Sequence, residues 1–452
     1  MSAATSLGSV LPDIRVPPPG PASRAMAARL ARVESRNVTY LDDDWPVFWE
    51  EAVGSNVRDP DGNVYLDLTS AFGVALLGHA PVPVRRAMEE QTRLIHGMGD
   101  IHPPAKKLEL LEALAAISPW PETRTILAGS GSEAVEAALK TARLATGRPG
   151  ILAFDGGYHG LTLGSLAATE RPHFRSGFEE RLYGGVAFAP FPDPFRDDDG
   201  NGERALEVVA RLLEEGAPNG HPIGTVIVEP IQARGGCRVP PSTFLGELGR
   251  LAREAGALVV ADEIFTGLGR CGALFASAKL GLEADIVCVG KALGGGIPVS
   301  ACLGPPRVMD AWPPSDGEAI HTSTFLGHPL ACAAAVEVLD EILHGSILAD
   351  ANRVGDALRR GLAEGLSDCA SVGEVRGTGL LLGVDLVGAD GRAPAAGAGA
   401  RIAKRGLKEG LILLPAGDVG NVVELTPPVT LTGEQVSFVV DTLVRAIQEE
   451  MP

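Results

Sequence analysis

One lysine, Lys291, lies within the apolar run DIVCVGKALGGGIPVSA and is followed closely by three consecutive glycines. A lysine in such a run either reaches solvent or takes part in chemistry, because burying an unpaired ammonium group is costly. A nucleotide-binding P-loop is excluded, since that motif needs glycine where Asp285 stands and serine or threonine where Ala292 stands. Two interpretations remain: a solvated loop lysine, and a desolvated lysine that forms a Schiff base with a carbonyl cofactor.

Two further stretches place an acid and an aromatic side chain after apolar runs. Asp262 ends such a run in VVADEIFTGLGRCG, and a buried acid there needs a cationic or hydrogen-bonding partner, either in a structural ion pair or in a site. Tyr158 and His159 lie in the glycine-rich stretch FDGGYHGLTLGS. The tyrosine could stack on a planar ligand, or it could simply pack within its loop.

Three stretches contain groups that could bind anions. Ser130, Gly131 and Ser132 open a predicted helix in AGSGSEAVEAALK, where they either bind an anion or only cap the helix. Thr324, in HTSTFLGHPLACAAA, precedes another predicted helix with the same two alternatives. Arg376, in VRGTGLLLGVDL, is either a surface charge or a fork for a carboxylate.

These residue types fit one cofactor when they are taken together. An acid suited to a pyridinium nitrogen, an anion site, a stacking aromatic ring and a Schiff-base lysine are what pyridoxal phosphate requires. The conjunction carries more weight than any single stretch, and it favours the Schiff-base interpretation of Lys291.

The elements that must position these residues alternate along the chain. From about residue 124, short β-rich runs are separated by stretches with helical apolar spacing, which predicts an α/β fold with a mostly parallel sheet covered by helices on both faces. Ligands gather at the carboxyl ends of such strands, where the candidate residues lie. We expect a Pro-rich N-terminal arm and part of a small domain in 1–80, a large cofactor-binding domain in 81–335 and a small α+β domain in 336–452.

The composition limits the class of protein. The chain has 452 residues and a net charge of -18, which argues against nucleic acid as a partner. Its six cysteines lack the paired short spacings of a metal site, so we expect reduced thiols in a cytoplasmic protein without a bound metal. No signal peptide and no apolar stretch long enough to span a membrane is apparent.

From about Val47 to its C-terminus the sequence resembles class III aminotransferases, the ornithine/4-aminobutyrate aminotransferase group of fold-type I pyridoxal phosphate enzymes. Five motifs carry the resemblance: GSGSEAVEAALK, YHG, VVADEIFTGLGRCG, VGKALGGG and STFLGHPLACAAA. The resemblance implies a homodimer whose two active sites lie at the subunit interface.

The resemblance also implies roles for the cofactor-binding residues. Lys291 would form the Schiff base and then move the proton between Cα and C4′, while Asp262 would keep the pyridine nitrogen protonated. Tyr158 would stack on the ring, and Glu229, in VEPIQ, would support the aspartate region. The residues implied to hold the phosphate or to belong to the same motifs are Ser130, Gly131, Ser132, His159 and, from the other chain, Thr324.

For the substrate, the resemblance implies that Arg376 receives the α-carboxylate and that Phe72, in TSAFGVALLGH, lines the pocket. Three positions depart from the family pattern. Phe265 stands where a glutamine near the phosphate is common, and Leu161 where many members have an arginine for a distal carboxylate. Arg234 replaces the glutamate that often pairs with the equivalent of Arg376.

The last two departures suggest that Arg234 takes over the distal carboxylate, which would favour dicarboxylates and disfavour donors with a second ammonium group. The alternative, that Arg234 points to solvent, stays open. The implied reaction is transfer of an amino group from an ω-amino acid or amine, 4-aminobutyrate- or ornithine-like, to a keto acid such as 2-oxoglutarate. A pyridoxal phosphate-dependent racemase, epimerase or decarboxylase of the same fold, or a non-catalytic cofactor-binding relative, would share most of these motifs.

Overall fold

The computed structural model describes residues 7–97 and 101–451. The chain forms two compact units: unit one joins the chain up to Pro81 with the chain from Asp350 onward, and unit two is Val82–Ala349. The boundary expected near residue 335 falls inside helix α12 (Pro329–His344), which packs along its length on α3 (Val82–Leu94) and α4 (Ala105–Ile117). The helix therefore stays whole within unit two, and the boundary moves to the start of α13 (Ile347–Gly365).

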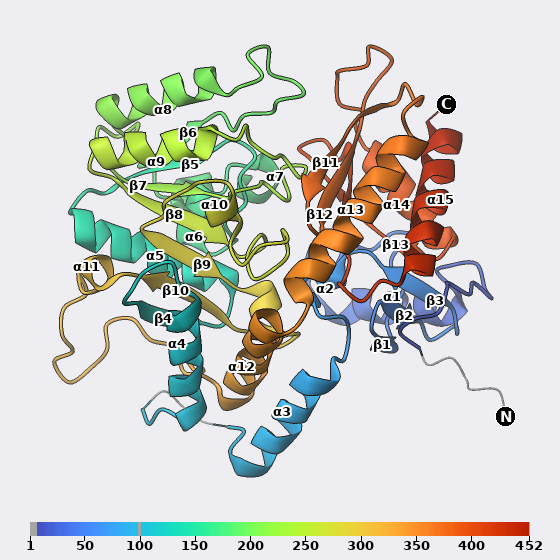
Figure 1. Cartoon of the computed structure of the whole chain (residues 1–452), viewed down its shortest axis with the longest axis horizontal. Coiled ribbons are helices and arrows are strands. Elements are labelled where there is room, and N and C mark those ends of the chain that lie inside the picture. The colour runs from blue at the N-terminus through green and yellow to red at the C-terminus, as the bar shows by residue number, and fades with distance from the viewer. Residues whose placement is uncertain (1–6, 98–100, 452) are drawn as a thin grey trace. The chain divides into compact units, whose positions relative to one another are not determined.

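Unit two, as far as it is described, contains one sheet of seven strands in the order β4-β10-β9-β8-β7-β5-β6 (Figure 1). Its strands are β4 (Arg124–Ala128), β5 (Gly150–Phe154), β6 (Val186–Ala189), β7 (Ile223–Val228), β8 (Leu258–Glu263), β9 (Ile286–Val289) and β10 (Ser300–Gly304). β10 is antiparallel to both of its neighbours, while β9, β8, β7, β5 and β6 are mutually parallel. The predicted mostly parallel α/β sheet is confirmed.

Helices cover both faces of this sheet because successive strand residues point in opposite directions. In β5, Ala153 belongs to the core cluster beneath α5 (Gly131–Thr146). The next residue, Phe154, makes an edge contact with Phe244 of α9 (Phe244–Glu254), with ring centroids 6.1 Å apart. The other helices of unit two are α6 (Leu163–Ala168), α7 (Pro172–Arg175), α8 (Glu203–Glu215), α10 (Ala276–Lys279) and α11 (Pro306–Met309), with short 3-10 turns η1 (Glu179–Arg181) and η2 (Lys291–Gly294).

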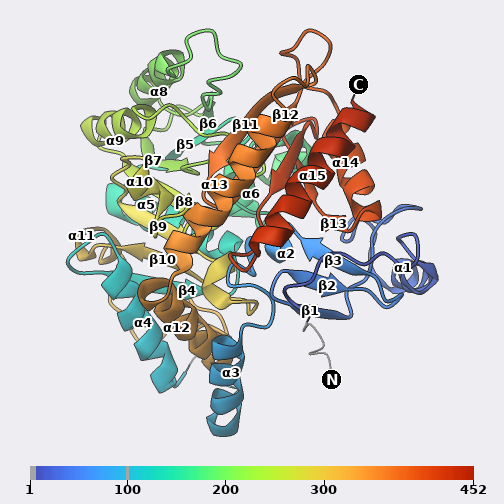
Figure 2. The same cartoon turned by 45° about the vertical axis from the view of Figure 1, so that its right-hand side comes forward.

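Unit one contains two four-stranded sheets in its described part, ordered β1-β2-β3-β13 and β11-β12-β15-β14 (Figure 2). Their strands are β1 (Glu51–Val53), β2 (Asn56–Arg58), β3 (Val64–Asp67), β11 (Val372–Thr378), β12 (Leu381–Leu386), β13 (Leu411–Ile412), β14 (Leu414–Ala416) and β15 (Val422–Leu425). The helices are α1 (Pro21–Val33), α2 (Ser70–Gly73), α13 from Asp350, α14 (Ala398–Lys408) and α15 (Gly433–Glu450). Unit one thus combines two small sheets with helices.

The expected N-terminal arm is bound to unit one from residue 7 onward; its first six residues lie outside the described part. Asp13 pairs with Val64, and the amides of Arg15 and Val16 donate to Asn63 Oδ1 at 2.8 and 2.9 Å. Among the described residues, no helix combines the length and apolarity needed to cross a membrane.

Candidate active site

Residues that follow the parallel strands of unit two share one edge of the sheet, because the carboxyl ends of parallel strands point the same way. Strand β4 runs in the same direction as β9, because both are antiparallel to β10, so the carboxyl end of β4 lies at the same edge. The predicted residues that follow or end these strands are Ser130 after β4, Tyr158 and His159 after β5, Glu229 after β7, Asp262 in β8 and Lys291 after β9. The fold thus brings these candidate residues of unit two to the same edge of the sheet.

A buried acid and imidazole form the centre of this edge. His159 Nδ1 and Asp262 Oδ2 lie 2.7 Å apart, and both residues are buried. Asp262 Oδ1 accepts the Ile264 amide at 3.1 Å. Burial lowers the pKa of His159, but the hydrogen bond to Asp262 and its charge more than offset this, so the net pKa is raised. The arrangement favours a protonated His159 imidazole beside the Asp262 carboxyl group.

Glu229 lies beside this pair and connects two loops. Its carboxylate accepts the amides of Tyr158 at 2.9 Å and Ala233 at 3.3 Å. Burial raises the pKa of Glu229 to about 7, the charge of Asp262 adds to the shift, and His159 opposes it. Glu229 therefore holds the Tyr158 loop against the segment after β7 and titrates near neutral pH.

This raised pKa predicts a pH-dependent stability difference. Because the folded-state pKa, about 7, exceeds the ordinary value of 4.5, the folded state binds the proton more tightly and the unfolding free energy falls as pH rises from about 4.5 to about 7. Glutamine does not titrate, so the Glu229→Gln variant should not show this fall in unfolding free energy. Between pH 5 and 8 the variant should gain up to about 3 kcal/mol of unfolding free energy relative to the wild type, measured by denaturant titration. Parallel pH curves for the two holoenzymes would contradict the prediction.

Tyr158 is half-buried, and its ring centroid lies 5.3 Å from that of Phe174 in an edge contact. Burial raises the pKa of Tyr158, and the positive charge of Arg234 is the largest opposing influence. Arg234 is itself half-buried, and its backbone oxygen accepts Arg171 Nη1 at 2.6 Å. Its charge therefore acts on the ring that is predicted to stack on the cofactor.

Lys291 begins the turn η2 with a left-handed backbone, φ 42°. Such a conformation is strained for a residue with a side chain and is typical of functional sites. Its Nζ lies 4.2 Å from the ring centroid of Phe265, a buried residue two positions after the end of β8. Phe265, one of the departures from the family pattern, thus gives the lysine an aromatic face.

The start of α5 is closed by a helix cap and is also a candidate anion site. Ser130 is the N-cap: its Oγ accepts a hydrogen bond from the Glu133 amide, and the Glu133 carboxylate accepts one from the Ser130 amide. The Ser132 hydroxyl instead contacts Thr162 and Ser165 at 2.8 and 2.6 Å. In the part of the chain that the structure describes, the Gly131 and Ser132 amides have no acceptor. Backbone N–H groups, rather than the predicted hydroxyls, are therefore the donors that an anion could use there.

Close packing explains why glycine occupies position 131. A Cβ atom at Gly131 would lie 2.8 Å from Ile264 Cγ2, so a side chain there would push the start of α5 away from the end of β8. The anion site and the Asp262 strand are therefore held close to each other.

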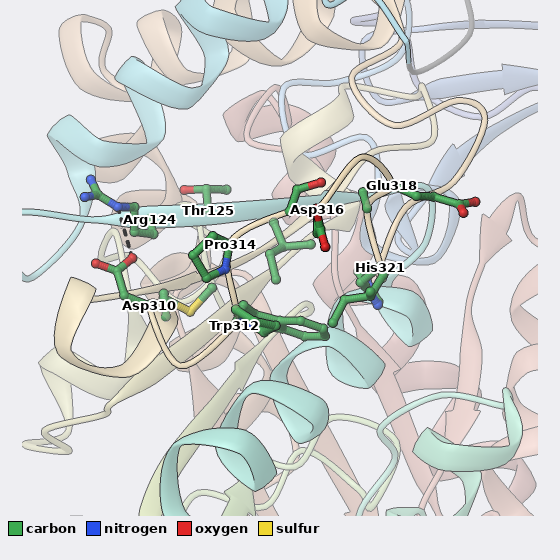
Figure 3. A pocket seen from close by; sticks show the side chains of 14 residues that line it. Arg124, Thr125, Asp310, Trp312, Pro314, Asp316, Glu318 and His321 are labelled. Atoms are coloured by element: carbon green, nitrogen blue, oxygen red, sulfur yellow. Dashed lines mark hydrogen bonds and ion pairs between the residues drawn. The ribbon is translucent and has the colours of Figure 1, made fainter.

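Thr324 lies in unit two, in the segment before α12. His328, not Thr324, is the N-cap of α12, and Thr324 is exposed. The same segment borders a cavity of about 950 Å³ beside β4, shown in Figure 3. Trp312 closes one side of it and donates from Nε1 to Thr141 Oγ1 at 2.8 Å. None of the predicted site residues lines this cavity.

Phe72 belongs to unit one and lies in a strained segment. Ser70, Ala71 and Phe72 all have positive φ, at 47°, 49° and 67°. The buried carboxylate of Asp67 holds this segment by accepting the amides of Thr69 at 2.8 Å and Ala71 at 2.9 Å. Phe72 is 40% exposed.

Arg376, also in unit one, is buried and has acidic partners of its own. Its Nη1 lies 3.0 Å from Asp385 Oδ2 and 3.2 Å from Glu374 Oε2. These acids were not identified from the sequence. The family pattern has its acidic partner for Arg376 at position 234, where this chain has arginine, and no other position was considered. Strand alternation would have placed Glu374 on the same face as Arg376, two residues away.

The model of the aminotransferase class-III family matches residues 39–447, most of the chain. The chain belongs to this family. The aminotransferase is similar to the 5-aminovalerate aminotransferase of Pseudomonas aeruginosa, with 35% identity over 86% of the chain and 91% of the relative. It is also similar to the alanine/serine racemase of Pyrococcus horikoshii, with 34% identity over 97% of the chain and 93% of the relative.

Among solved structures, the aminotransferase is similar to a PLP-bound amine transaminase from an uncultivated Pseudomonas species. The TM-score is 0.82 and the sequence identity 29%, covering 92% of the chain and 98% of that structure. The family and these relatives identify the chain as an aminotransferase that uses pyridoxal phosphate (PLP).

The residues present fit PLP. The amides of Gly131 and Ser132 suit its phosphate, and the buried Asp262, paired with His159, suits its pyridine nitrogen. The strained Lys291 follows β9, the strand that pairs with β8. These groups come from four strand ends of one sheet, so a rigid scaffold fixes them.

Proposed function

We propose that the aminotransferase moves an amino group from an ω-amino acid or amine, 4-aminobutyrate- or ornithine-like, to a keto acid such as 2-oxoglutarate. The observation that carries this proposal is the buried His159–Asp262 pair at the sheet edge from which Lys291 also extends. The similarity to a 5-aminovalerate aminotransferase supports an ω-amino acid as donor.

PLP, when bound, supplies a carbonyl that links to the amine and a ring that takes up the electrons released when the Cα–H bond breaks. Lys291 would hold the cofactor covalently, and its Nζ, once free, would take the proton from the Cα of the donor. Asp262 would bind the pyridine nitrogen, and His159, 2.7 Å from Asp262 Oδ2, orients the Asp262 side chain.

The remaining residues bind and orient. The Gly131 and Ser132 amides hold the phosphate together with Thr324 from a second copy of the chain, while Ser130 caps the helix that carries them. Tyr158 covers one face of the ring, and Glu229 fixes the Tyr158 amide. In the substrate pocket, Arg376 receives the α-carboxylate and Phe72 contacts the aliphatic part of the substrate.

Arg234 binds the distal carboxylate of the acceptor in this proposal, since its charge acts on Tyr158. Arg234→Glu should lower kcat/KM for 2-oxoglutarate by roughly ten- to a hundred-fold, the cost of losing hydrogen bonds to a charged group. Pyruvate, which has no distal carboxylate, should be little affected. Arg204→Glu, at an exposed position on α8, is the matched control. An unchanged acceptor profile in steady-state assays would refute this role.

The proposed enzyme is a cytoplasmic homodimer. Large apolar side chains on unit two are strongly exposed, among them Leu94 at 80%, Ile101 at 88%, Ile320 at 69% and Phe325 at 68%, which suits a subunit interface. Light scattering should give twice the chain mass of 46.8 kDa.

All six cysteines are free and five are buried, as in a reducing compartment, so thiol titration of the denatured protein should find six reduced thiols.

Racemisation is the second candidate activity, favoured by the similarity to an alanine/serine racemase over nearly the whole chain. Incubating the holoenzyme with a single L-amino acid and no keto acid separates the two reactions. A transaminase converts one equivalent of cofactor per subunit to its amine form and releases one equivalent of keto acid. Continuous loss of optical activity without keto acid would instead identify a racemase.

A further inference from the structure

A small cavity of about 310 Å³ lies along helix α5 in unit two. Its lining residues come from α5, from loops beside it and from the starts of strands β5 and β7. The candidate active site lies at the other end of these strands, where their carboxyl ends meet. Within α5, Arg143 in the cavity wall is about 18 Å along the helix axis from Gly131 at the candidate anion site. The cavity is therefore separate from the site that suits PLP.

Side chains that donate hydrogen bonds converge on this cavity from several elements: they are Lys140, Arg143, Tyr183 and Thr225. In the part of the chain that the structure describes, the side chains of Arg143, Tyr183 and Thr225 form no hydrogen bond or ion pair. Lys140 Nζ contacts His321 Nδ1 at 3.4 Å. Burial and the charge of Lys140 lower the pKa of His321, so this ring is a neutral partner that does not compensate the lysine charge.

Thr225 is the polar group of this cavity that most needs a partner. It is 2% exposed, and the face of β7 that carries it also carries Ile227 of the core beneath α5. A buried hydroxyl that lacks a hydrogen bond destabilises the folded state, and such groups are rare in folded proteins. An acceptor inside the cavity would supply the missing bond.

The cations at the cavity lack an acid from the chain itself. Among the described residues that line it, Glu136 is the one acid, and its Oε1 already accepts the Thr162 hydroxyl at 2.7 Å and the Gly164 amide at 2.9 Å. No ion pair joins Lys140 or Arg143 to an acid within the described ranges, although the chain has a net charge of -18. Two cations and two hydroxyl donors without acceptors suit a ligand rich in acceptors, that is, an anion.

The rest of the lining is apolar and comes from Leu139, Pro149 and Ile151. The volume lies at the lower end of the range for ligand cavities, so the ligand is small. We propose that this cavity is a binding site for a small carboxylate with an apolar body. Lys140 and Arg143 bind the carboxylate, the two hydroxyls donate to it, and the apolar side chains contact the body. The site does not depend on which donor and acceptor the enzyme uses.

The test uses benzoate as the probe and measures its dissociation constant calorimetrically on the holoenzyme. Arg143→Ala should raise this constant about ten-fold or more, because a hydrogen bond between charged groups is lost. Thr225→Val keeps the shape of the side chain but removes the hydroxyl, and it should raise the constant about three- to ten-fold. Arg211→Ala is the matched control: Arg211 is exposed on α8 and pairs with Glu215, so its loss should leave the constant unchanged.

Benzamide has the shape of benzoate without its charge, and it should bind to the wild type at least about ten-fold more weakly. Benzoate bound at the strand-end site would be insensitive to both substitutions in the cavity. Equal dissociation constants for the wild type, Arg143→Ala and Thr225→Val would therefore overturn the inference. A wild type that binds no benzoate at millimolar concentration would overturn it as well, and neither result bears on amino transfer.

Discussion

Replacing Lys291 with alanine is expected to reduce transamination by roughly 10⁴- to 10⁶-fold, as for removal of a residue that carries the covalent step. The alanine variant keeps the Asp262 strand and the start of α5, so PLP should still bind, but without a covalent link to the chain. Steady-state rates measure the first effect. Loss of the protein-linked visible absorbance band, together with cofactor that gel filtration in dilute buffer removes, measures the second.

The matched control is Lys408→Ala, at an exposed position in the last turn of α14. It should retain wild-type rates and a wild-type absorbance band. Residual transamination in Lys291→Ala at more than about a hundredth of the wild-type rate would contradict the role of Lys291, because no other group is expected to move the proton that efficiently.

Asp262→Asn has the second-largest expected effect, a loss of about 10²- to 10³-fold in kcat, because a neutral amide cannot stabilise the protonated pyridine nitrogen. The covalent link at Lys291 should persist, so the absorbance band distinguishes this variant from Lys291→Ala. Without the carboxylate, burial dominates the pKa of His159 and lowers it. An NMR titration of the His159 ring should therefore show an imidazole that loses its proton at lower pH than in the wild type.

Asp310→Asn serves as the control for this variant. Asp310 is exposed and pairs with Arg124 at 3.3 Å, outside the strand-end site. Its replacement should alter neither kcat nor the His159 titration. Equal kcat values for Asp262→Asn and Asp310→Asn would refute the proposed role of Asp262.

The sequence allowed the centre of this site to be predicted because its residues end or follow strands with strong local signals. The run ALVVADEI predicted a buried strand before Asp262, and AGSGSEAV predicted the start of a helix capped by Ser130 or Ser132. Strand β8 and helix α5 confirm both elements, with Ser130 as the cap. Parallel strands of one sheet align their carboxyl ends, so residues separated by more than a hundred positions could be placed together without coordinates.

Features that depend on contacts between distant segments could not be predicted. Strands β6 and β10 were missed, since GGVAFA and VSACLG are short and rich in small residues that carry little strand preference. The Ser132 hydroxyl forms hydrogen bonds with Thr162 and Ser165, thirty or more residues away in the sequence, rather than facing the candidate anion site. The pairing of Arg376 with Asp385 requires the register of a hairpin, which one sequence does not reveal.

The most direct test of the central claim is to reduce the holoenzyme with borohydride and map the modified peptide by mass spectrometry. Reduction fixes the cofactor to the lysine that holds it. The account predicts one pyridoxyl group per subunit, on the peptide that contains Lys291 and on no other. Modification at a different lysine, or cofactor released entirely on denaturation after reduction, would contradict it.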